Sequence, residues 1–135
     1  MREQMNWLRP LIPSWRFFDR AGDPTRLSVR TRLSHGSFGA WKPVLSRPRR
    51  GFLNLFLHPE GNLYLANQGV VDRLVQELEH ATDVESLTSF ELCRQLAIRA
   101  AVNSTTPRPL LILQFRIEVC GRENYEALIS REYEI

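Results

Sequence analysis

A strict alternation near the C-terminus limits the fold of this chain more than any other feature. Every second residue is large and apolar over the segment that runs from Leu111 to Val119, and the intervening residues are mostly polar. This period of two places one row of side chains on each side of a β-strand. The segment is therefore predicted to be a half-buried strand in a sheet that is covered on one face.

Three further segments complete the predicted sheet. Residues 26–33 and 127–135 alternate in the same way, and 34–37 and 121–124 have the composition of turns. Residues 38–44 are predicted to return as a second strand, which Pro43 should keep short or at an edge.

Two helices are predicted between the strand pairs. Val70, Val71, Leu74, Val75 and Leu78 form one helical face, and this helix is expected to start at Asn62 or Asn67, after a turn at 58–61. The second helix should run from Thr88, where Thr88 and Glu91 have the spacing of a capping box, to about Val102.

The order β-β-α-α-β-β predicts an α+β fold with two layers, in which an antiparallel sheet of about four strands carries both helices on one face. The length of 135 residues suits one domain. We expect a single domain over residues 26–135 and an aromatic, basic arm over residues 1–25.

Composition excludes several classes of protein. Hydrophobic residues make up 43% of the chain and charged residues 24%, values typical of folded soluble proteins. The longest apolar run, residues 110–113, is far too short for a transmembrane helix, and the N-terminus lacks the features of a signal peptide. A cytoplasmic protein is expected, and two distant cysteines indicate no disulfide framework.

Positive charge is concentrated in the first part of the chain. Residues 1–50 hold ten arginines and one lysine against three acids, a net charge of +8, whereas the remainder carries −5. Arg26, Arg30 and Arg32 share one side of the first strand. If the first two strands form a hairpin, this side lies near three arginines of the loop that follows the second strand: Arg47, Arg49 and Arg50. Such a row is suited to a phosphate backbone, although a solvated outer face is the alternative.

The N-terminal arm mixes aromatic and basic residues, with Trp7 and Trp15 as its largest side chains. This composition is typical of segments that lie at a membrane interface or bind a groove of a partner. The alternative is that the aromatic residues pack onto their own domain.

Sequence motifs for catalysis are missing from the chain. It has no nucleophile elbow, phosphate-binding loop or zinc-binding pattern, and its three histidines are widely spaced. Cys93 is interpreted as a buried helix residue. No catalytic, cofactor or metal residue is predicted, and no cofactor is expected.

Short motifs resemble one known family. Ser14-Trp15-Arg16-Phe17-Phe18, then Leu92-Cys93-Arg94 on a helix and a terminal hairpin, are similar in order to the soluble region of bacterial vitamin K-dependent carboxylase-like, horizontally transferred transmembrane proteins. The usual prolines after the Trp and the Phe are missing, as are the membrane helices of that family. No catalytic role therefore carries over, and the resemblance implies a separate module that sits beside a membrane partner.

The leading prediction is a small non-enzymatic accessory or interaction module whose basic, aromatic N-terminal third contacts a protein partner or an anionic membrane surface. A nucleic-acid-binding protein that uses the arginine row is the alternative. A small enzyme or ligand-binding domain is the third hypothesis, because distant side chains can converge in a pocket. A homodimer through the terminal strand is a further possibility.

Overall fold

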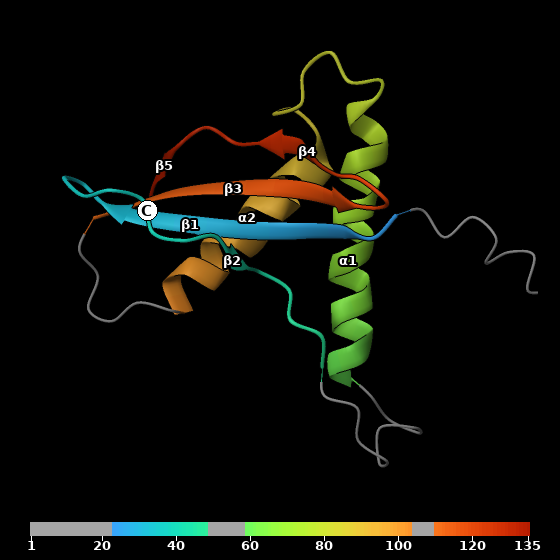
Figure 1. Cartoon of the computed structure of the whole chain (residues 1–135), viewed down its shortest axis with the longest axis horizontal. Coiled ribbons are helices and arrows are strands. Elements are labelled where there is room, and N and C mark those ends of the chain that lie inside the picture. Colours follow the sequence, from blue (N-terminus) through green and yellow to red (C-terminus); the bar gives the residue numbers. More distant parts are fainter. Residues whose placement is uncertain (1–22, 49–58, 104–109) are drawn as a thin grey trace, which may run out of the picture.

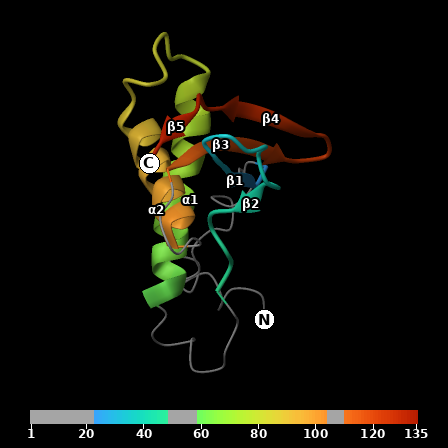
Figure 2. The same ribbon diagram turned by 90° about the vertical axis from the view of Figure 1, so that its left-hand side faces the viewer.

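A computed structural model describes residues 23–48, 59–103 and 110–135 of the chain (Figure 1). The elements follow in the order β1 (Thr25–Leu33), β2 (Lys42–Pro43), α1 (Pro59–Leu78), α2 (Thr88–Asn103), β3 (Leu111–Cys120), β4 (Asn124–Ile129) and β5 (Tyr133–Glu134). Figure 2 shows both helices on the same side of the sheet. The predicted α+β architecture is therefore confirmed.

All strand pairs are antiparallel, in the spatial order β2-β1-β3-β4, with β5 paired to β3. The central pair, β1 and β3, is continuous from Thr25 opposite Val119 to Leu33 opposite Leu111. The strand with the strongest alternation in the sequence thus lies at the centre of the sheet. Partners across this pair share a face, so the apolar rows of both strands point to the helices.

The apolar row and the helices form one core. Phe115, Leu113 and Ile117 of β3 have no exposed surface, and the ring of Phe115 lies 5.5 Å from that of Phe90 on α2, measured between centroids. The buried residues of this core cluster are Leu27, Val29, Val71, Leu74, Phe90, Cys93, Ala97, Ala101, Leu113, Phe115 and Ile117. Each large side chain buried here contributes about 1.5–3 kcal/mol.

The predicted final strand is broken into β4 and β5, and it starts earlier than expected. Ile129 pairs with Arg116 and Tyr133 with Leu113, so the returning chain carries an extra residue between these pairs. Ser130 bridges the break: its N–H donates to the Phe115 carbonyl at 2.8 Å, and its Oγ accepts from the Phe115 N–H at 2.9 Å. A bulge of this kind explains why unbroken alternation was a wrong expectation.

Two other boundaries differ from prediction. The strand expected over 38–44 is reduced to the two residues of β2, a short edge strand as Pro43 suggested. The turn predicted at 58–61 is wrong from Pro59 onward, because α1 begins there. Proline at the first helical position costs no hydrogen bond and has the φ angle that a helix needs.

Helix α1 crosses the sheet at the end where β1 begins, and its N-terminal half extends beyond the β2 edge (Figure 1). Helix α2 begins at Thr88, as predicted, and the Ser89 hydroxyl donates to the Glu77 carboxylate of α1. Neither helix of the described chain combines the length and apolar character needed to cross a bilayer.

Candidate interaction surface

The arginine row predicted on β1 lies on the sheet face opposite the helices. Arg26 is opposite Glu118, Arg30 is opposite Gln114, and the buried Ser28 between them is opposite Arg116. Arg116 of β3 therefore joins the same face. The alternation of β1 and β3 accounts for this arrangement, since neighbouring partners across a ladder point the same way.

Arg30 is held by contacts within the protein. Its guanidinium carbon lies 4.4 Å from the ring centroid of Phe38 and 4.5 Å from that of Trp41. Its Nε and Nη2 donate to Gln114 Oε1 at 3.0 and 2.6 Å. Arg116 lies 4.5 Å from the centroid of the same Trp41 ring, which thereby contacts two guanidinium groups. Cation–π contacts of this kind stabilise by roughly 0.5–1 kcal/mol each.

Arg32 is also engaged. It forms a 2.8 Å ion pair with Glu132 and donates to the Ser34 carbonyl at 3.1 Å. Two arginines of the predicted row thus hold the loop after β1 and the end of the chain against the sheet. Phe38 and Trp41 serve here as stacking partners for arginine.

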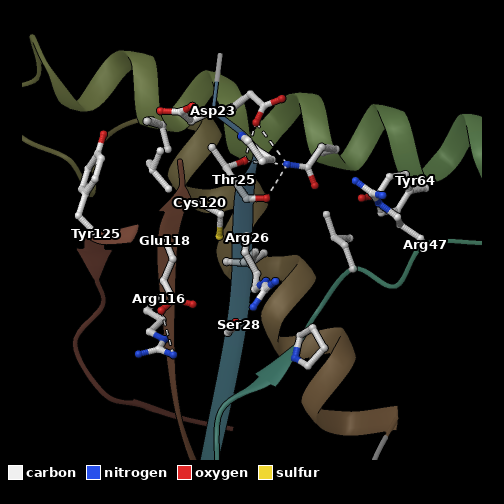
Figure 3. Close-up of a pocket in the computed structure, with 18 of the residues that line it drawn as sticks. Asp23, Thr25, Arg26, Ser28, Arg47, Tyr64, Arg116, Glu118, Cys120 and Tyr125 are labelled. Atoms are coloured by element: carbon white, nitrogen blue, oxygen red, sulfur yellow. Dashed lines mark hydrogen bonds and ion pairs between the residues drawn. The ribbon is translucent and has the colours of Figure 1, made fainter. Parts of the chain in front are cut away.

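A groove with a volume of about 1280 Å³ opens at the end of the sheet where β1 begins (Figure 3). Its walls are residues 64–76 of α1, the start of β1, the segment after β2 and the end of β3. The lining residues from α1 are Tyr64, Leu65, Gln68, Asp72, Val75 and Gln76. Arg26 and Arg47 contribute guanidinium groups from β1 and from the segment after β2.

A polar cluster of Thr25, Gln68 and Asp72 links the start of β1 to α1 by hydrogen bonds. Gln68 Nε2 donates to the Thr25 carbonyl at 3.0 Å and lies 2.7 Å from Thr25 Oγ1. Thr25 Oγ1 donates to Asp72 Oδ1 at 2.5 Å. The Asp72 carboxylate therefore has donors from the protein itself, and the helix is fixed to the start of the strand.

The other charges of the groove divide into paired and unpaired groups. Glu118 forms a 3.1 Å ion pair with Arg116. Arg26 and Arg47 are exposed and form no ion pair with any residue in 23–48, 59–103 or 110–135. Asp23 is exposed and lies against Gly121 in the β3–β4 turn, where an added Cβ would collide with Asp23 Oδ2. Substitution of this glycine would displace the carboxylate.

The remaining candidates from the sequence carry no site in the described chain. Burial raises the pKa of the Cys93 thiol from 9.0 to about 12, so it is protonated at neutral pH. No group of three or more metal-ligating side chains lies together among the described residues. Trp7, Trp15, Arg49 and Arg50 lie outside those residues, and their predicted contacts stay predictions.

Sequence analysis missed the contribution of α1 to the groove. The signal was Leu65, which lies seven residues before Asp72 and therefore on the polar side of the helix, whereas Leu63 and Tyr64 lie seven residues before Val70 and Val71, on the apolar side. In a helix, Leu65 thus points away from the core. No pattern in the sequence indicated that Gln68 and Asp72 would meet Thr25, because this contact requires α1 to cross the sheet.

Comparison with protein-family models, curated proteins and solved structures finds no match to this chain. The resemblance to vitamin K-dependent carboxylase-like proteins therefore stays a prediction.

Proposed function

We propose that this protein is a non-enzymatic interaction module that binds a segment of a partner protein in the groove between α1 and β1. The size of the groove is the observation that carries the proposal. Its volume of about 1280 Å³ is larger than the roughly 300–1,000 Å³ of pockets that hold small molecules. A length of polypeptide fills such a space better than a metabolite does.

The arrangement of the arginines favours a protein over a nucleic acid. A phosphate backbone is tracked by several free cations in a row, and affinity depends on how many phosphates they neutralise. Arg30 and Arg32 are occupied by Gln114 and Glu132, which leaves Arg26 and Arg47 as the free members of the predicted set that the structure describes. Contact of Trp7 and Trp15 with a partner or an anionic membrane remains part of the proposal.

Affinity capture with matched variants tests this function. Wild-type protein, the groove variant Arg26→Glu/Arg47→Glu and the control Arg73→Glu/Arg99→Glu are immobilised and exposed to the same nuclease-treated extract. The control makes an equal charge change at exposed helix positions outside the groove. We expect the wild type and the control to retain the same proteins and the groove variant to lose them. Equal retention by all three would contradict the proposal.

A further inference from the structure

We infer that the bound segment is acidic and carries a large apolar side chain: its carboxylates pair with Arg26 and Arg47, and its apolar residue packs on Tyr64 and Leu65 of α1. This inference rests on the proposed function and specifies the chemistry of the partner.

Charge complementarity supports the acidic character that we infer for the bound segment. Formal charges in the groove cancel, but they are not equally available to a ligand. Asp72 accepts hydrogen bonds from Thr25 and Gln68, and Glu118 is paired with Arg116. Asp23 forms no ion pair with a described residue, so two unpaired arginines stand against one unpaired carboxylate. Arg26 and Arg47 have no such partner among the described residues. Guanidinium binds carboxylate through two parallel hydrogen bonds, so an incoming acidic side chain supplies what these groups lack.

Exposed leucines on α1 support the large apolar side chain that we infer for the bound segment. Leu65 lines the groove with 66% of its surface exposed, and Leu63 beside it is 63% exposed, whereas Val71 and Leu74 on the same helix are fully buried. Single exposed leucines are common on protein surfaces. Leu65 shares the groove lining with the half-buried Tyr64 and Leu45. The groove thus combines apolar side chains with its two free cations.

The same lining disfavours a nucleic acid. Asp23 borders the groove and forms no ion pair with a described residue. A phosphate backbone carries a charge at every nucleotide, so it would bring phosphates next to Asp23 as well as to the two arginines. A peptide can place a neutral residue beside Asp23 and acidic residues beside the arginines.

Selection from a displayed library of short random peptides tests the inference. The full-length wild type, Arg26→Glu/Arg47→Glu, Leu65→Asp and the control Arg73→Glu/Arg99→Glu are used as bait. We expect the wild type and the control to enrich peptides that combine Asp or Glu with Leu, Phe or Trp. The charge-reversed variant should bind those peptides at least about tenfold more weakly, because attraction becomes repulsion. Leu65→Asp should lose them as well.

Circular dichroism verifies that each bait is folded, and Leu65→Asn replaces Leu65→Asp if the latter unfolds. Peptides that bind the wild type and are lost with Leu65→Asp, yet contain no acidic residues, would overturn the inference and leave the proposed function standing. Peptides insensitive to every groove substitution would overturn both. So would salt-sensitive binding of a single-stranded DNA oligonucleotide that Arg26→Glu/Arg47→Glu abolishes, since the groove would then bind nucleic acid.

Discussion

The two faces of the β1–β3 pair share one hydrogen-bonded ladder but are stabilised differently. On the inner face, Phe115 and its neighbours are sealed by two helices. On the outer face, Arg30 and Arg116 stack on Trp41 from the loop after β1. The alternation of the sequence separates the two rows, but it does not indicate what covers the outer one. A row of arginines can be a structural device, and only its unpaired members are available for binding.

The largest loss of stability is expected from a substitution on the inner face. Phe115→Ala should lower the free energy of unfolding by about 3–5 kcal/mol, because it leaves a cavity between the sheet and α2. Urea denaturation measures this change. Ile129→Ala, at a side chain that is 44% exposed, is the control and should change stability by less than about 0.5 kcal/mol. Similar losses from both substitutions would show that the inner face is not the dominant core.

A smaller effect is expected on the outer face. Trp41→Ala removes the ring that contacts two guanidinium groups and should cost about 2 kcal/mol, combining two cation–π contacts with lost packing. Trp41→Phe keeps an aromatic face and should cost less. Urea denaturation of the three proteins orders them. A loss as large as that of Phe115→Ala would show that the two faces contribute equally to stability.

Cys93, which packs against the inner face, should make the free energy of unfolding depend on pH above the ordinary pKa of a thiol. Burial holds the Cys93 thiol protonated, with its pKa raised from 9.0 to about 12, while the unfolded chain ionises at the lower value. The free energy of unfolding should therefore fall as pH rises above 9.0, by about 1.4 kcal/mol per pH unit from this group.

Urea denaturation at about pH 8 and about pH 10, for the wild type and Cys93→Ala, isolates the contribution of the thiol, since the variant keeps every other titrating group. Equal pH dependence in the two proteins would contradict the buried, protonated state of Cys93.

The smallest effect concerns a partly exposed pair on the outer face. A double-mutant cycle on Arg32→Ala and Glu132→Ala should give a coupling below about 1 kcal/mol, because solvent screens the two charges. The coupling should decrease further in high salt. A value comparable to the Trp41→Ala loss would mean that ion pairing, rather than stacking, dominates the outer face.

Regular patterns in the sequence predicted the regular parts of the fold. The alternation over 111–119 and 26–33 anticipated the central pair, Thr88 marked the start of α2, and Pro43 limited β2. The start of α1 was missed because Pro59 suits both a turn and a first helical turn. The break after Ile129 was missed because a bulge adds a residue without changing the composition of the strand.

The candidate site was predicted less completely. Arg26 and Arg47 were predicted as contact residues, a role that stays a prediction, and the structure brings both to one groove. Arg30 and Arg32 lie between these two residues in the chain, and nothing in the sequence indicated that they would be paired. Their partners, Gln114 and Glu132, are far along the chain, and such contacts are set by strand register.

The sequence by itself determined the two central strands, the side of each that enters the core and the start of α2, because these follow from local periodicity, the burial of apolar surface and the residues that begin a helix. The tertiary structure decided which arginines are paired, where α1 crosses the sheet and that a groove opens beside Thr25 and Gln68. Those properties depend on side chains that approach one another across the sheet, and their spacing along the chain carries no record of that approach.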